Sequence, residues 1–130
     1  MFLQFFQQLF CFFLHVGETG SFRKPLRREE EQACFEALAA GDRSAREKLI
    51  LHNMRLVAHV IKKYGMPQPE QEELISIGTV GLVKAVDSFD CTKGARFATY
   101  ASKCINNEIL MNFRSQKKHA DQIYMGEPIE

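Results

Sequence analysis

The sequence predicts an all-α fold, a compact helical bundle, and three observations lead to this class. Apolar residues recur at helical spacing in several segments between residues 29 and 117. Gly41, Gly65 and Pro67 separate these segments, and glycine and proline are common where helices stop. No segment alternates apolar and polar residues for long, so a sheet is not indicated. With 130 residues, the chain is long enough for one compact core.

The beginning of the chain, residues 1–16, is rich in phenylalanine and carries no charge. As a helix it would extend about 24 Å, which is less than the ~30 Å hydrocarbon core of a bilayer. It lacks the features of a secretory signal, namely basic residues ahead of the apolar run and a small-residue cleavage site after it. A basic cluster follows: Arg23, Lys24, Arg27 and Arg28. We therefore predict a flexible or membrane-associating leader and linker over residues 1–22, with a core helix as the alternative.

Four helices are predicted after the leader. They cover residues 29–40, 42–64, 70–89 and 98–117, with a loop over residues 90–94 before the last. Glutamates open the first helix, and Asp42 is suited to cap the second. We expect these helices to form one domain over residues 23–118, followed by a tail over residues 119–130.

The third predicted helix is apolar on two faces. One stripe is suited to the core: Leu74, Gly78, Leu82, Ala85 and Phe89. A second apolar stripe lies elsewhere on the helix, beside Glu73, Ser76 and Thr79: Ile77, Val80 and Val83. Such a helix is either central in a bundle or shared with a partner. Gly78 and Gly81 each cost about 1 kcal/mol relative to alanine in a helix, which indicates close packing there.

The fourth predicted helix has a different division of side chains. Its inward stripe is Ala101, Ile105, Ile109 and Phe113, and its other side carries Thr99, Lys103, Asn106, Asn107, Arg114 and Lys117. The net charge is only +1, but basic residues outnumber acidic ones between residues 90 and 118. Cations hold phosphates, aromatic rings stack on unpaired bases and asparagine reads base edges. This side, with Phe97 and Tyr100 at its start, indicates single-stranded DNA binding; alternatively, both rings close the end of the bundle.

No pattern of catalytic or metal-ligating residues is present. The cysteines at positions 11, 34, 91 and 104 form no C-x-x-C pair, as expected for reduced thiols in a cytoplasmic protein. His52 and His59 lie seven residues apart with no carboxylate spaced to complete a site. We expect neither an enzyme nor a cofactor.

Three elements occur in order along the chain: N-M-R-L-V-A-H-V-I-K-K-Y over residues 53–64, E-L-I-S-I-G-T-V-G-L-V-K-A-V over residues 73–86 and F-A-T-Y-A over residues 97–101. Together they resemble region 2 of bacterial RNA polymerase sigma factors, especially sporulation sigma factors of the sigma-K type. The resemblance covers residues 26–130. It implies a module that binds core RNA polymerase and recognises and melts the minus-ten promoter element in transcription initiation of sporulation genes.

The resemblance implies two sets of site residues. Core polymerase, through the coiled coil of its β′ clamp, would contact Glu73, Ser76, Ile77, Thr79 and Val83, and Val80 of the second apolar stripe joins them. The non-template strand of the minus-ten element would contact Phe89, Asp90, Lys93, Arg96, Phe97, Thr99, Tyr100, Lys103 and Asn107, and Arg114 of the basic side joins them. Tyr100 would stack on a flipped adenine, and Lys93, Arg96 and Lys103 would hold phosphates.

The chain departs from the family pattern at three places. Ala95 stands where an aromatic residue usually follows the loop glycine. Lys103 and Cys104 stand where housekeeping members carry two tryptophans, which implies weaker strand separation. We also expect that the linker and helix-turn-helix of complete members are absent here, so that residues 119–130 lead toward missing regions. The leader resembles the sigma-K pro-sequence, which implies a membrane-embedded processing protease as a further partner.

Two other hypotheses remain open. In one, the chain is a truncated or decoy fragment that occupies the polymerase without opening promoters. In the other, it is a membrane-attached helical adaptor, for which the leader is the only support.

Overall fold

The computed structural model describes residues 3, 4, 7 and 23–126. Within residues 23–126 the chain forms helices and no strand: α2 (Arg28–Ala39), α3 (Arg43–His52), α4 (Met54–Lys62), α5 (Gln68–Ser88), the 3₁₀ helix η1 (Cys91–Lys93) and α6 (Phe97–Gly126). The predicted all-α fold is confirmed. The predicted leader and linker lie outside the described residues, apart from three positions. No helix in the described ranges has both the length and the hydrophobicity needed to cross a membrane.

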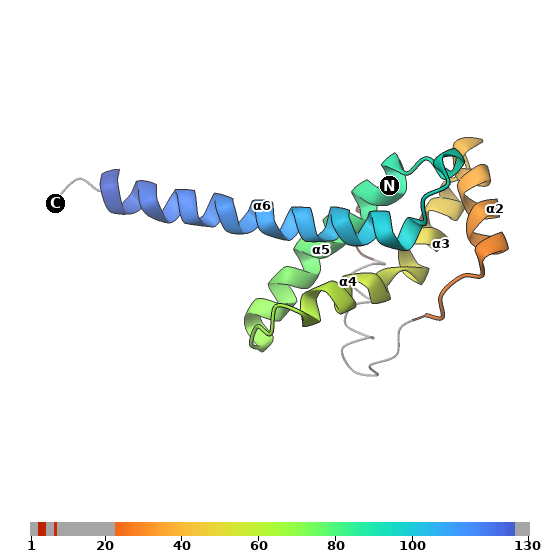
Figure 1. Cartoon of the computed structure of the whole chain (residues 1–130). Helices are drawn as coiled ribbons and strands as arrows, with labels where there is room; N and C mark the ends of the chain where they lie inside the picture. The colour runs from red at the N-terminus through yellow and green to blue at the C-terminus, as the bar shows by residue number, and fades with distance from the viewer. Residues whose placement is uncertain (1–2, 5–6, 8–22, 127–130) are drawn as a thin grey trace.

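The core of the bundle is formed by α4, α5 and the first half of α6, and α2 and α3 pack at one end of it (Figure 1). Leu82, Ile105 and Ile109 are fully buried in this core, and Leu49 of α3 is fully buried as well. The two inward stripes predicted for residues 70–89 and 98–117 are confirmed, because nearly all of their members are buried and Phe89 and Phe113 pack against the core from its edge.

The prediction of one continuous helix over residues 42–64 is wrong. The chain bends at Asn53, which separates α3 from α4. The buried Asn53 side chain donates a hydrogen bond from Nδ2 to the carbonyl oxygen of Leu49 at 2.7 Å, and its backbone N–H bonds instead to Ile50 at 3.2 Å. An asparagine that bonds the backbone in this way competes with the helical ladder. The bend lets α3 pack against α2 while α4 packs against α5 and α6.

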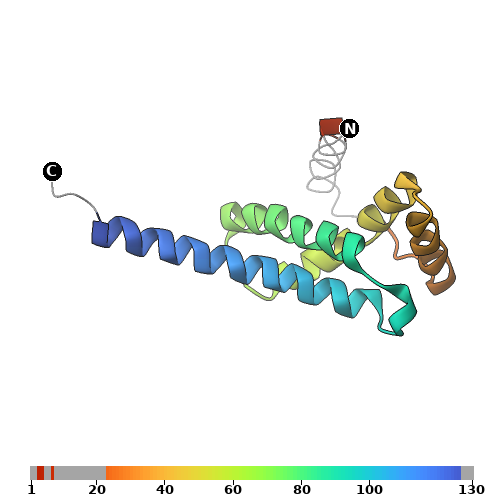
Figure 2. The same cartoon turned by 90° about the horizontal axis from the view of Figure 1, so that it is seen from above.

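Helix α6 is longer than predicted and passes through the expected domain boundary at residue 118 to Gly126. Its C-terminal half projects beyond the other helices, as two perpendicular views show (Figures 1 and 2). Residues 114–124 are exposed along this projecting part. The apolar stripe that faces the core ends before this part, so apolar periodicity predicted an end of the helix that is too early. Good helix formers such as Gln116, Lys117 and Lys118 continue the helix beyond the stripe.

Candidate nucleic-acid interface and partner-binding surface

The loop between α5 and α6 is held in shape by Asp90. Its carboxylate accepts hydrogen bonds from the backbone N–H and the hydroxyl of Thr92, at 2.9 and 2.6 Å. These bonds hold the pKa of Asp90 below its usual value, and the bond from the Thr92 hydroxyl has the largest effect. Gly94 has a φ of 75°, a left-handed conformation that suits glycine, and it ends η1. The backbone conformation of the loop is therefore fixed, and it carries Lys93 and Arg96, which are both exposed.

Aromatic rings join this loop to the bundle. Phe35 of α2 lies 4.9 Å from Phe89 and 5.0 Å from Phe97, and Phe89 lies 5.3 Å from Phe97, all between ring centroids. The Phe97 ring is 1% exposed. The Phe97 ring therefore belongs to the core, where it fills the junction of α2 with α6, which agrees with the alternative that this ring closes the end of the bundle. A contact of Phe97 with DNA stays a prediction. Phe89 is half-buried and lies at the edge of the same cluster.

Tyr100 lies one turn into α6 and is only partly buried. Its ring is tilted against Phe89 with centroids 5.5 Å apart, and its hydroxyl is 2.7 Å from Ser88 Oγ. These contacts from the end of α5 orient the ring while leaving part of it accessible. A pre-oriented, accessible ring is suited to stack on an unpaired base.

The side of α6 that was predicted to be basic faces solvent. Its members Thr99, Lys103, Asn107 and Arg114 are all exposed. Among the described residues, no carboxylate lies within ion-pair distance of Lys103 or Arg114. The acidic residue of this helix segment, Glu108, points to the other side, where Lys84 of α5 binds it at 3.0 Å. The exposed cations thus leave this side of α6 electropositive.

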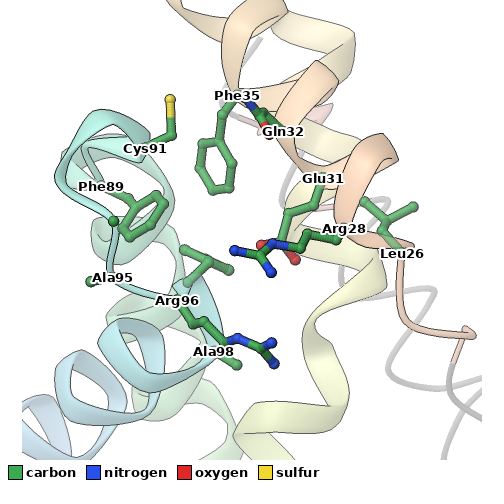
Figure 3. Close-up of a pocket in the computed structure, with 12 residues that line it drawn as sticks. Leu26, Arg28, Glu31, Gln32, Phe35, Phe89, Cys91, Ala95, Arg96 and Ala98 are labelled. Carbon is green, nitrogen blue, oxygen red and sulfur yellow. The ribbon is translucent and has the colours of Figure 1, made fainter.

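A cavity of about 330 Å³ lies between α2, the loop and the start of α6 (Figure 3). Phe35 and Phe89 form an apolar wall, and Arg28, Glu31 and Arg96 extend toward the same space. Burial raises the pKa of Glu31, an effect that Arg55 and Arg96 oppose. Sequence reasoning missed Arg28 and Glu31 as lining residues, because no periodicity shows that α2 meets the loop.

The exposed stripe of α5 contains most of the predicted polymerase contacts. Glu73, Ser76 and Val80 are exposed, Val80 by 41%, and Ile77 and Val83 are half-buried at the margins. Thr79 does not belong to this stripe. It is 4% exposed and donates a hydrogen bond from Oγ1 to the Ile75 carbonyl at 2.7 Å. The structure corrects its predicted position, since a residue one helical step from Val80 turns toward the bundle.

The fold and these surfaces define an all-helical module with an electropositive side on one long helix and an exposed apolar stripe on its neighbour. The Sigma-70 region 2 family model matches residues 49–119, from α3 into α6. The chain therefore belongs to the sigma-70 region 2 family.

Curated relatives agree with this assignment. The chain is 43% identical to an RNA polymerase sigma-28 factor of Bacillus thuringiensis subsp. kurstaki over 95% of its length and 52% of the relative. It is 45% identical to the RNA polymerase sigma-K factor of Bacillus subtilis (strain 168) over 77% of its length and 34% of the relative. It is 42% identical to the RNA polymerase sigma-E factor of Clostridium acetobutylicum over 88% of its length and 49% of the relative. The chain thus spans about half, or less, of these relatives.

Proposed function

We propose that this chain is a sigma factor module that binds core RNA polymerase through α5 and recognises and melts the minus-ten promoter element through α6 and the preceding loop. The polymerase contacts would be Glu73, Ser76, Ile77, Val80 and Val83. The contacts to the non-template strand would be Phe89, Lys93, Arg96, Thr99, Tyr100, Lys103, Asn107 and Arg114, with Asp90 shaping the loop. The names of the relatives and the resemblance to sporulation sigma factors support transcription initiation of sporulation genes as the process.

The observation that carries this proposal is the juxtaposition of Tyr100 with the exposed cations of α6. Extruding a base from a duplex costs stacking energy, which a new aromatic contact can offset. Cations beside the ring hold the strand while the base is captured. Tyr100 lies one turn before Lys103, and Arg96 lies one turn before Tyr100. This spacing brings both kinds of contact to the same end of α6.

Tyr100→Ala is expected to weaken binding of the chain, with core polymerase present, to single-stranded minus-ten DNA by about 1–3 kcal/mol. Tyr100→Phe is expected to keep most of the affinity, because stacking uses the ring; it loses only the hydroxyl contact with Ser88. Fluorescence anisotropy with cognate and scrambled oligonucleotides measures the effect. Equal losses on both oligonucleotides, or no loss on either, would show that the ring is structural.

A second candidate function is a decoy that occupies core polymerase without productive promoter opening. One feature of the sequence favours the decoy. Lysine and cysteine stand at positions 103 and 104, where housekeeping members carry tryptophans, so the two rings that help to separate the strands are lacking. Salt-dependent and sequence-selective binding to minus-ten DNA would support the promoter-reading module. Polymerase binding without sequence selectivity would support the decoy.

We further propose that residues 1–22 associate with membranes and are removed by a membrane-embedded protease. The support is in the sequence: an uncharged, phenylalanine-rich run followed by the basic residues Arg23, Lys24, Arg27 and Arg28. Apolar side chains would enter the interface, and each cation near an anionic surface would add about 1 kcal/mol.

The full chain is expected to float with anionic liposomes in a density gradient, whereas a chain beginning at Phe22 is expected to stay at the bottom. Both chains keep the basic cluster, so the comparison isolates the contribution of the phenylalanine-rich run. Full-length protein that remains free of liposomes would rule out membrane association of the leader.

A further inference from the structure

The side of α4 that faces solvent is basic. Arg55, His59 and Lys62 follow one another at helical spacing and are all exposed, and α4 contains no acidic residue. Among the described residues, no carboxylate lies within ion-pair distance of Arg55 or Lys62. The half-buried Glu31 is close enough to interact electrostatically with Arg55 and offsets part of its charge. We call Arg55, His59 and Lys62 the basic face of α4.

The leader joins the folded domain beside the start of α4. The carbonyl oxygen of Lys24 accepts a hydrogen bond from Nδ1 of His52 at 2.9 Å. His52 is the last residue of α3, and α4 begins two positions later at Met54. Arg23, Lys24 and Arg27 are exposed in this segment. Further basic residues therefore lie next to the N-terminal end of α4.

The connection between the phenylalanine-rich run and the domain is short. Lys24 follows Val16, the end of that run, by eight positions, which span at most about 28 Å even when fully extended. A run inserted in a bilayer would therefore keep the junction of α3 and α4 close to the surface, at a high effective concentration. Anionic headgroups attract cations over about one Debye length, roughly 8–10 Å, so they would turn a basic side of the domain toward them.

We infer that the basic face of α4 lies on an anionic lipid bilayer when the leader is inserted, with Arg55 and Lys62 as its contacts to the headgroups. This contact depends on the proposed membrane association of residues 1–22 and extends it from the leader to the folded domain. One weak apolar anchor gives only marginal binding, and a basic patch beside it supplies the second signal that stable binding requires. The face is thus expected to act only together with the leader.

Nucleic acid is the competing occupant of this face. The residue after Lys62, Lys63, lines a groove of about 320 Å³ together with Lys103 of α6, so the basic face borders the DNA-binding side of α6. The bilayer is favoured because the hydrogen bond between Lys24 and His52 fixes the attachment of the leader beside α4.

The double variant Arg55→Gln/Lys62→Gln tests this contact in the full chain. Partitioning is measured by co-sedimentation with vesicles of phosphatidylcholine and phosphatidylserine in equal amounts, and with vesicles of phosphatidylcholine alone. We expect the variant to bind the anionic vesicles about tenfold more weakly than the wild type, since each cation near an anionic surface contributes a factor of about five and Glu31 offsets part of the Arg55 charge. Binding to the neutral vesicles is expected to stay unchanged.

The matched control is Lys48→Gln/Lys118→Gln, which removes the same charge from exposed positions on α3 and on the projecting part of α6. It is expected to bind the anionic vesicles nearly as well as the wild type. Arg55→Lys/Lys62→Arg keeps both charges and is expected to keep the affinity. All three variants are expected to keep the thermal midpoint, because the replaced side chains are exposed.

Wild-type chain that binds the anionic vesicles while Arg55→Gln/Lys62→Gln binds them as well as the control would overturn the contact of α4 with the bilayer. An equal loss on neutral vesicles would also overturn it. A variant that keeps vesicle binding but loses affinity for minus-ten DNA with core polymerase would assign the face to nucleic acid instead. Wild-type chain that binds neither kind of vesicle would refute the membrane association of the leader as well.

Discussion

Val80→Asp is expected to abolish binding of the chain to core RNA polymerase while leaving its helical content unchanged. Val80 is 41% exposed at the centre of the α5 stripe, so an aspartate there is tolerated in the free chain. In a docked complex the same carboxylate would lose its water without gaining a partner. Loss of a central apolar contact costs about 2 kcal/mol or more, and the buried charge adds to it. Co-purification with core polymerase and far-ultraviolet circular dichroism provide the two measurements.

The matched control is Ile123→Asp, because Ile123 is 52% exposed but lies near the end of the projecting part of α6. It introduces the same charge on another helix and is expected to leave polymerase binding intact. Ile77→Asp is expected to abolish binding too, although Ile77 packs partly against the core and some loss of stability will accompany it. If Val80→Asp and Ile77→Asp both still co-purify with core polymerase, the α5 stripe is not the docking surface.

Gly81→Ala is expected to cause the larger loss of stability among the α5 glycine substitutions. A Cβ at Gly81 would lie 2.7 Å from the Ile105 Cα and 2.9 Å from the Cys104 carbonyl oxygen, both backbone atoms of α6. Helices α5 and α6 would have to separate, and overpacking of this kind costs about 1–3 kcal/mol or more. The gain in helix propensity, about 1 kcal/mol, offsets part of it. A net loss of about 2 kcal/mol lowers the thermal midpoint by roughly 10 °C in a domain of this size.

Gly78→Ala is the comparison for this prediction. Its Cβ would lie 2.8 Å from Val57 Cγ1 and 3.3 Å from Ile105 Cγ2, which are side-chain atoms. Side chains can shift by a few tenths of an ångström more easily than a helix backbone, so we expect a smaller loss. Thermal unfolding followed by circular dichroism measures both variants. A Gly81→Ala chain as stable as Gly78→Ala would contradict the close approach of the two helices.

The two faces of α5 show which features of the structure apolar periodicity can predict. The core stripe, the exposed Val80 and the need for glycine at positions 78 and 81 were all predicted, because helical geometry alone decides which residues share a face. Thr79 was assigned to the wrong face, since the motif that carried the resemblance contains residues from both. A hydroxyl that bonds its own helix backbone can be buried at little cost, so its polarity did not reveal its position.

The positions of Asn53 and Phe97 could not be predicted from the sequence, for a different reason. Asparagine is unfavourable within a helix, and this signal was present in the sequence, but only the bonded geometry at Leu49 shows that the chain bends there. Phe97 lies beside basic residues in sequence, and this proximity suggested a stacking role. Its ring is buried because Phe35 of α2 and Phe89, which directly follows α5, pack against it.

Local patterns by themselves determined which segments are helical and which residues form their inward stripes, because each stripe depends on residues one or two helical turns apart. Three motifs in order along the chain determined the family to which it belongs. Tertiary packing alone decided which helices meet. The cavity between Glu31 and Arg96 and the groove between Lys63 and Lys103 each join side chains that are distant in sequence. Those pairs come together because the bend at Asn53 turns α4 against α6 and the aromatic cluster holds α2 against the loop. The physical reason is that burial of apolar surface selects the arrangement of whole helices, and the polar side chains on their edges are brought together as a result.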